Sequence, residues 1–175
     1  MKKIIAILCT LLITLSMSAQ KQKKVLVAYF SATGTTESVA KQVASAAKAD
    51  IYEIKPTSKY TSADLDWHDK QSRSSVEMAD KNSRPTMKGN VKNIKKYSTI
   101  YIGFPIWWGV CPRIINTFIE ANNLKGKTII PFATSGSSQI AGAVKELRGT
   151  YPTLTIKDGK LLNDASTADI KKFVK

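Results

Sequence analysis

The sequence predicts an α/β fold, a three-layer α/β/α sandwich around an open, doubly wound parallel sheet. Short apolar runs alternate with stretches of helical spacing, the pattern of a parallel sheet that helices cover on both faces. Two of the runs, residues 24–30 and 99–104, are almost wholly apolar, as strands buried on both faces are. Five strand-helix units in about 155 residues are too few for a barrel, which needs about 250 residues.

The first half of the chain supplies three strands and one helix. Residues 24–30 form the first strand, and residues 35–48 form a helix because alanines and valines recur there at helical spacing. Residues 51–54 form a second, more polar strand that Pro56 ends, and residues 99–104 form the third.

The second half continues the alternation. Pro112 stands where a first helical turn tolerates proline, and the apolar residues after it recur at helical spacing. The expected elements are a helix over 114–119, a strand over 128–133, a helix over 140–147, a fifth strand over 154–162 around an Asp158-Gly159 turn, and a short helix over 168–174.

One segment interrupts this alternation. Residues 56–96 contain ten apolar residues in 41, well below the 43% of the whole chain. A connection of that length indicates a functional loop or lid, with a helix near residues 74–81. Ligands of such folds bind beyond the carboxyl ends of the strands, so the loops after the first, third and fourth strands are the candidate site.

Length and composition indicate one globular domain. The 175 residues include 43% hydrophobic and 23% charged residues, which excludes a disordered tail, a fibrous protein and a polytopic membrane protein. Two cysteines cannot form a disulfide-rich scaffold, and a single histidine, His68, leaves little scope for His-based metal or triad chemistry. We therefore expect no metal site.

Residues 1–19 are predicted to be a secretory signal peptide, which leaves residues 20–175 as the domain. Lys2 and Lys3 precede an uncharged run over residues 4–15, and small residues follow up to Ala19. The alternative, an uncleaved anchor, would need about 20 apolar residues to span a membrane. The sequence thus predicts an exported protein of the periplasm or cell envelope, with no membrane span in the mature chain.

The mature chain would carry 25 basic and 13 acidic residues, a net charge of +12. Such a charge suits nucleic acid, acidic surfaces or anionic substrates. The lysines are scattered, and no arginine-rich stripe or recognition helix stands out. We therefore expect a solvated basic surface and no nucleic-acid partner.

The loop after the first strand is a candidate phosphate cradle. Ser31-Ala-Thr-Gly-Thr-Thr36 places four hydroxyl groups and one glycine at a strand-to-helix turn, where backbone N–H groups and the helix dipole favour an anion. The chain lacks both the Walker A and the Gly-x-Gly-x-x-Gly patterns. A terminal monophosphate held by neutral donors remains, and the alternative is an ordinary threonine-rich helix cap.

Two further loops complete the candidate site. Trp107 and Trp108 lie in Gly103-Phe-Pro-Ile-Trp-Trp-Gly109 after the third strand, where indoles suit stacking on a flat ring; the alternative is packing beneath residues 56–96. Thr134-Ser-Gly-Ser-Ser138 after the fourth strand supplies small residues and N–H groups suited to a heteroaromatic edge, although it could equally be a plain turn.

Together these loops resemble those of the flavodoxin family, from about Lys24 to the C-terminus. Residues 31–36 match the family's Ser/Thr-x-Thr-Gly-x-Thr phosphate loop, and residues 105–109 resemble the flavin-flanking loop of a bacterial branch. The resemblance implies FMN as the cofactor and the short-chain form of a five-stranded parallel sheet in the order 2-1-3-4-5. It assigns the phosphate to Ser31, Ala32, Thr33, Gly34, Thr35 and Thr36, the isoalloxazine ring to Pro105, Ile106, Trp107, Trp108 and Gly109, and the pyrimidine edge to Thr134, Ser135, Gly136, Ser137 and Ser138.

The chain departs from familiar flavodoxins in three ways. It is basic rather than acidic, it carries an export signal, and the loop after its fourth strand lacks the tyrosine that often covers the second flavin face. We expect an electron carrier that serves a redox partner protein or a small-molecule acceptor, with no catalytic side chain. The alternatives are an FMN-dependent NAD(P)H:quinone oxidoreductase, with residues 56–96 as a substrate lid, and a non-redox module that binds a phosphorylated ligand.

Four other residues have simple interpretations. His68 is expected to be a solvated loop residue rather than a proton donor near the flavin. Cys111 is expected to pack in the core. Arg73 and Arg84, in the long segment, could meet the ring or an acidic acceptor.

Overall fold

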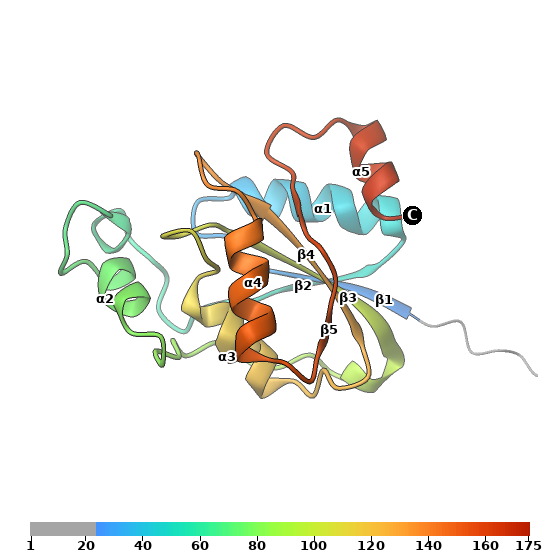
Figure 1. Cartoon of the computed structure of the whole chain (residues 1–175), viewed down its shortest axis with the longest axis horizontal. Helices are drawn as coiled ribbons and strands as arrows, with labels where there is room; N and C mark the ends of the chain where they lie inside the picture. The colour runs from blue at the N-terminus through green and yellow to red at the C-terminus, as the bar shows by residue number, and fades with distance from the viewer. Residues whose placement is uncertain (1–23) are drawn as a thin grey trace, which may run out of the picture.

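The computed structural model describes residues 24–175, which form a parallel sheet between two layers of helices (Figure 1). The predicted signal peptide lies outside these residues. Within the described range no helix is long and apolar enough to cross a bilayer. The strands are β1 (Lys24–Tyr29), β2 (Asp50–Glu53), β3 (Tyr97–Pro105), β4 (Thr128–Thr134), β5 (Thr155–Ile156) and β6 (Lys160–Leu161). The helices are α1 (Thr35–Ala47), α2 (Arg73–Ala79), α3 (Arg113–Ala121), α4 (Ala141–Thr150) and α5 (Thr167–Phe173), with 3-10 turns η1 (Ala63–Leu65) and η2 (Ile94–Lys96).

The strand order β2-β1-β3-β4-β5, with every pairing parallel, confirms the predicted fold class and the order 2-1-3-4-5. The order reverses between β1 and β3, which both lie in the middle of the sheet. Their carboxyl ends therefore border the crevice in which doubly wound folds bind ligands.

The edge of the sheet differs from the single fifth strand predicted within residues 154–162 around the Asp158-Gly159 turn, because two short strands lie there. β5 pairs with β4 through Thr128 and Thr155, whereas β6 pairs with β4 through Phe132 and Lys160, so one extra residue lies between the two short strands. Both run parallel to β4, so no reversing turn occurs at Asp158-Gly159. Pro131, which has no N–H to donate, lies on β4 between the two pairings and explains where the ladder breaks.

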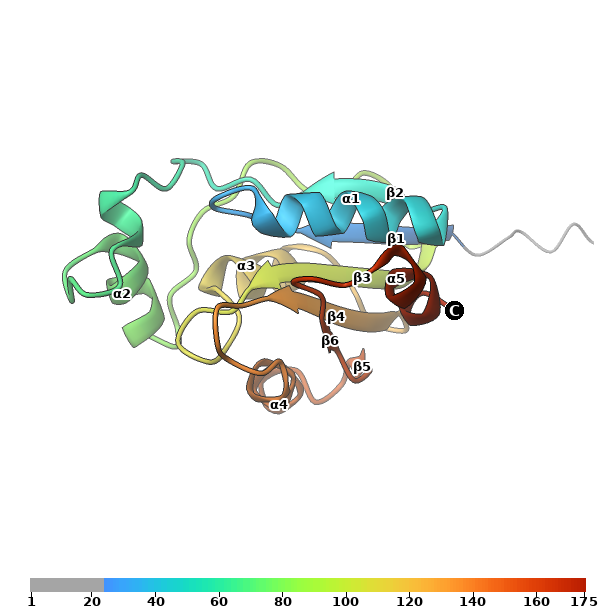
Figure 2. The same ribbon diagram turned by 90° about the horizontal axis from the view of Figure 1, so that it is seen from above.

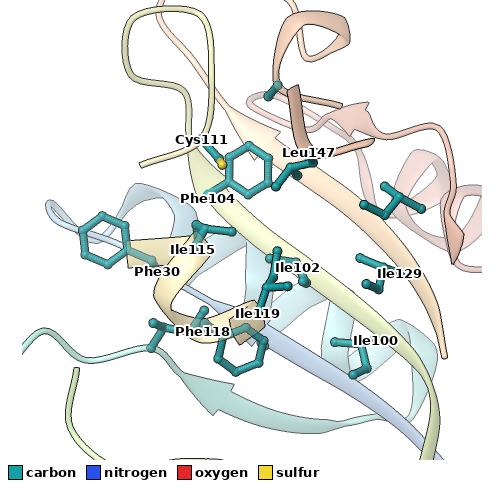
Figure 3. Close-up of a cluster of buried hydrophobic side chains, with 14 of the residues drawn as sticks. Phe30, Ile100, Ile102, Phe104, Cys111, Ile115, Phe118, Ile119, Ile129 and Leu147 are labelled. Atoms are coloured by element: carbon teal, nitrogen blue, oxygen red, sulfur yellow. The ribbon is translucent and has the colours of Figure 1, made fainter. Parts of the chain in front are cut away.

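Helices lie on both sides of the sheet (Figure 2), and alternate residues of β1 contribute to two hydrophobic cores, one on each side. Leu26 and Ala28 of β1 pack with α3 and α4, and Val27 and Tyr29 pack with α1 and α5. The α3/α4 core is the larger, and Figure 3 shows phenylalanine and isoleucine side chains from β1, β3 and α3 meeting there. Cys111 lies in this core with no exposed surface, and burial, together with the charge of Glu146, raises the pKa of its thiol to about 12. The prediction of a packing cysteine is confirmed.

The segment between β2 and β3 projects beyond the carboxyl edge of the sheet, where α2 lies apart from the main sandwich (Figures 1 and 2). It contains the predicted helix, as α2. Its base is closed by an antiparallel bridge between Pro56 and Met87. Arg84 donates to both carboxylate oxygens of Glu120 on α3 at 2.8 Å, so the returning half of the segment is fastened to the body.

Candidate functional site

A cavity of about 680 Å³ opens at the carboxyl edge of β1, β3 and β4. It brings together thirteen of the sixteen predicted site residues from the three loops; Ser31, Gly34 and Gly109 shape the loops without lining it. The lining residues are Ala32, Thr33, Thr35, Thr36, Leu65, Trp67, Ser74, Pro105, Ile106, Trp107, Trp108, Thr134, Ser135, Gly136, Ser137, Ser138 and Asn163.

The first wall is the β1–α1 turn. Ser31 Oγ accepts a hydrogen bond from the N–H of Gly34 at 3.1 Å, and Gly34 has φ 93°, a conformation that suits glycine because it has no Cβ. No side chain caps α1, so the N–H groups of its first turn remain available to a ligand. The exposed hydroxyl groups of Thr33 and Thr35 flank this helix start. The turn therefore has the donors that an anion site at a helix N-terminus needs.

A buried hydrogen bond joins the first and third loops. The hydroxyl groups of Thr36 and Thr134 lie 2.7 Å apart, and Thr36 is 1% exposed. The N–H of Ile106 donates to the carbonyl of Thr134 at 2.8 Å, which joins the second loop as well. The three loops are thus held in one arrangement by contacts beneath the cavity.

The second loop is a tight two-residue turn. Trp107 and Val110 exchange both backbone hydrogen bonds at 3.0 Å, while Trp108 and Gly109 at its centre have φ of 48° and 80°. Two positive φ values in succession define a type I′ turn. A positive φ is rare for a bulky side chain and costs about 1–2 kcal/mol. The turn presents Trp108, which is 51% exposed, at the mouth of the cavity.

Trp107 has a different environment. Its ring packs at steep angles against Phe30 and Tyr60, with centroid distances of 5.6 and 5.4 Å. Tyr60 belongs to the projecting segment, and burial, with the neighbouring Glu77 carboxylate, raises the pKa of its phenol. Trp107 therefore fastens the start of that segment to the core, while Trp108 has no aromatic neighbour in the described part of the chain.

The turn rests against α4 at Gly142. A Cβ added to Gly142 would lie 2.8 Å from the carbonyl oxygen of Gly109, whereas a Cβ on Gly149 of the same helix would meet nothing within 4 Å. We expect Gly149→Ala to raise the free energy of unfolding by about 0.5 kcal/mol, because alanine favours the helix. Gly142→Ala should lower it by about 1–3 kcal/mol, because the backbone of the turn must move. Urea unfolding of both variants tests this, and equal effects would contradict the contact.

The third loop is held by a residue that the sequence reasoning missed. The side chain of Asn163 accepts from the N–H of Ser135 at 2.8 Å and donates to the Ser135 carbonyl. The hydroxyl of Ser135 accepts in turn from the N–H groups of Ser137 and Ser138. Asn163 follows β6 at the same carboxyl edge. Ligands of such folds bind beyond the carboxyl ends of the strands, so including the loop after the last strand in the candidate site would have identified it.

The projecting segment contributes Leu65, Trp67 and Ser74 to the lining of the cavity. The sequence analysis did not predict these three residues as part of the site. Trp67 is 66% exposed, and its ring stacks on His68 with centroids 3.6 Å apart. An aromatic residue within the polar run Asp66-Trp-His-Asp69 was the available signal.

The two arginines of the segment and His68 do not line the cavity. Arg73 pairs with Glu77 at 2.7 Å, with its guanidinium 4.0 Å from the centroid of the Tyr60 ring, and Arg84 pairs with Glu120. The interpretation in which they meet the ring or an acceptor is therefore not supported. His68 is solvent-exposed, as expected.

The cavity is electrically neutral. None of its seventeen lining residues is charged, eight carry hydroxyl groups, and all three tryptophans of the chain are among them. Between residues 24 and 175 no cluster of His, Cys, Asp or Glu could hold a metal ion. The site is therefore built to hold a ligand by hydrogen bonds and aromatic contact.

These features define a class: a flavodoxin-like α/β protein with an aromatic, hydroxyl-rich cavity at the switch point of its sheet. The flavodoxin family model matches residues 24–175. The chain belongs to the flavodoxin family.

Solved structures agree with this membership. A Bacteroides uniformis protein provisionally assigned as a flavoprotein is 58% identical, with a TM-score of 0.85 over 87% of this chain and 97% of its own. A similar Bacteroides eggerthii protein is 53% identical, with a TM-score of 0.85 over 86% of this chain and 95% of its own. A Lactobacillus acidophilus flavoprotein solved in complex with FMN is 22% identical and shares the fold, with a TM-score of 0.67 over 87% of this chain and 99% of its own. No protein with a curated description matches the chain.

Proposed function

We propose that the chain binds FMN in this cavity and works as an electron-transfer protein. The observation that carries the proposal is the convergence of all three tryptophans and eight hydroxyl groups on one neutral cavity beside an uncapped helix start. Membership of the flavodoxin family and the FMN complex of the Lactobacillus acidophilus relative support the choice of ligand.

The residues present fit FMN. A volume of about 680 Å³ lies within the usual range for ligand sites, about 300–1,000 Å³. The hydroxyl groups of Thr33 and Thr35 and the start of α1 would hold the phosphate without a salt bridge, and residues 134–138 would meet the polar edge of the ring. Bound FMN would supply the one- and two-electron chemistry, while the protein binds, orients and electrically tunes it.

The different environments of the two adjacent indoles support different roles for them. Trp108 is half-exposed and held at the cavity mouth by a strained turn, so we assign the stacking contact to it. Trp107 is committed to Phe30 and Tyr60 and forms the inner wall. Trp67, from the projecting segment, adds a third indole to the cavity. In familiar flavodoxins a second aromatic residue, a tyrosine, comes instead from the loop after the fourth strand.

Replacing Thr33 or Thr35 by alanine should weaken FMN binding far more than riboflavin binding. A hydrogen bond to a charged group contributes about 1.5–3 kcal/mol, and riboflavin has no phosphate to lose it. Equilibrium dialysis of both ligands with each variant measures the difference. Equal losses for FMN and riboflavin would place the phosphate elsewhere.

The second candidate function is an FMN-dependent NAD(P)H:quinone oxidoreductase. It is favoured by the projecting segment, which contributes Leu65, Trp67 and Ser74 to the lining of the cavity. The decisive experiment adds NADH or NADPH to the FMN-loaded protein without oxygen, with and without a quinone. Slow bleaching by the nucleotide alone supports the carrier, and rapid bleaching with quinone turnover supports the enzyme.

We also propose that the protein is exported to the periplasm or cell envelope, on the pattern of residues 1–19, and receives FMN there. The signal contains Lys2-Lys3 and no twin arginine, which favours a secretory route that exports unfolded chains. An unfolded chain has no phosphate-binding loop, so FMN would bind after export. Fractionation should find the FMN-loaded protein outside the inner membrane. Full-length loaded protein confined to the cytosol would refute the proposal.

A further inference from the structure

A second cavity, of about 610 Å³, lies beside the first. It is formed between the end of α2, the start of α3 and one side of α4, and the two cavities share a single residue, Trp108. Apart from Trp108, no residue that lines it is assigned to FMN. Its volume is also within the usual range for small-molecule sites.

The charge of this second cavity contrasts with the neutral first one. Three cations line it, Lys81, Arg113 and Lys145, against one carboxylate, Glu146. Lys81 follows α2 and Lys145 lies on α4, and both are exposed. Within residues 24–175 neither lysine has an ion-pair partner, although seven other lysine or arginine side chains there pair with a carboxylate. Two free ammonium groups from different elements therefore face one hollow.

The floor of the cavity carries a buried donor without an acceptor. The side chain of Arg113 is 4% exposed; its Nη1 donates to Glu146 at 2.9 Å and its Nη2 to the carbonyl of Met78 at 3.3 Å. Its Nε has no partner, and neither has Oε2 of Glu146, the second carboxylate oxygen of the same ion pair. A buried polar atom left unpaired is costly, so these two atoms mark a place for a ligand group that accepts a hydrogen bond from Arg113 and donates one to Glu146.

Part of the lining is apolar. Met78, Val110 and the half-exposed indole of Trp108 face the same hollow as the lysines. An apolar wall beside free cations suits a ligand with a ring and an oxyanion group, since the ring stacks while the charge is neutralised.

We propose that this second cavity binds a small organic anion, with its ring against Trp108 and its oxyanion group between Lys81 and Lys145. The site stands independently of what fills the first cavity. Because Trp108 is the shared wall, a bound anion would lie beside the flavin if the proposed function is correct, and would make the site a place for an anionic electron donor or acceptor.

The experiment compares naphthalene-2-sulfonate with the uncharged naphthalene-2-sulfonamide, two probes of nearly the same shape. Their affinities are measured by calorimetry on the mature chain saturated with FMN, so that the first cavity is filled. We expect the sulfonate to bind at least tenfold more tightly. Lys81→Gln and Lys145→Gln should each weaken it about two- to fivefold, the usual effect of one exposed ion pair.

Lys171→Gln, on α5 at the opposite face of the sheet, is the matched control for overall charge and should change nothing. Equal binding of both probes, or an equal effect of the control, would overturn the proposal. So would a sulfonate that excess FMN displaces or that Thr36→Ala weakens, because it would then occupy the first cavity. A chain that fails to bind FMN but binds the sulfonate through the two lysines would refute the proposed function and leave this site standing.

Discussion

Replacing Trp108 by alanine is expected to weaken FMN binding by about 1–3 kcal/mol, the range for stacking of a flat heteroaromatic base on an aromatic side chain. The indole is half-exposed, lines the cavity and has no aromatic neighbour among the described residues, so little of the fold depends on it. The free energy of unfolding of the flavin-free protein should therefore be almost unchanged. Fluorescence titration with FMN and urea unfolding give the two quantities.

Two matched variants separate stacking from packing. Trp107→Ala should destabilise the flavin-free protein by about 3 kcal/mol, because it removes a large side chain packed on Phe30 and Tyr60. Trp108→Gly should stabilise it by up to about 1 kcal/mol, because glycine relieves the positive φ, while it weakens FMN binding as alanine does. If Trp108→Ala cost stability and left FMN affinity intact, the roles of the two indoles would be reversed.

Replacing Glu146 by leucine is expected to destabilise the protein by about 3 kcal/mol, the lower end of the cost of breaking a buried ion pair. The pair is asymmetric: the Arg113 side chain is 4% exposed and that of Glu146 is 21% exposed. Removing Glu146 leaves a buried guanidinium with only the Met78 carbonyl as an acceptor. Arg113→Leu should lower the free energy of unfolding by less than Glu146→Leu does, because the Glu146 carboxylate that remains can reach water.

The double variant Arg113→Leu/Glu146→Leu completes the cycle. Replacing both partners of a buried pair by apolar residues is often nearly neutral, so the double variant should recover most of the loss caused by Glu146→Leu. Urea unfolding of the four proteins measures the coupling energy. A larger cost for Arg113→Leu than for Glu146→Leu would contradict the burial argument.

The central part of the fold was predictable because its strands are buried on both faces. The nearly continuous apolar runs of β1, β3 and β4 predict strands that are buried on both faces. Their alternation with helices predicts that the strands run parallel. The edge was less predictable: β5 and β6 are two residues each, and the break beside Pro131 depends on pairing across the sheet, which a local pattern does not show.

The site was predictable as far as it lies in the three loops after β1, β3 and β4. Its remaining residues come from other parts of the chain: Asn163 after β6, and Leu65, Trp67 and Ser74 from the segment between β2 and β3. The different roles of Trp107 and Trp108 depend on a type I′ turn that places a tryptophan at positive φ, which residue preferences argue against. Tertiary contacts, not local sequence, decide that conformation.

The most direct test of the account is a fluorescence titration of FMN with the purified, flavin-free mature chain. If FMN occupies the neutral cavity against Trp108, its fluorescence should fall to a plateau at one flavin per chain, and riboflavin should bind more weakly. The same titration with Trp108→Ala should leave most of the fluorescence unquenched at saturation. FMN fluorescence that stays unchanged at every protein concentration would contradict the assignment of this cavity to the flavin.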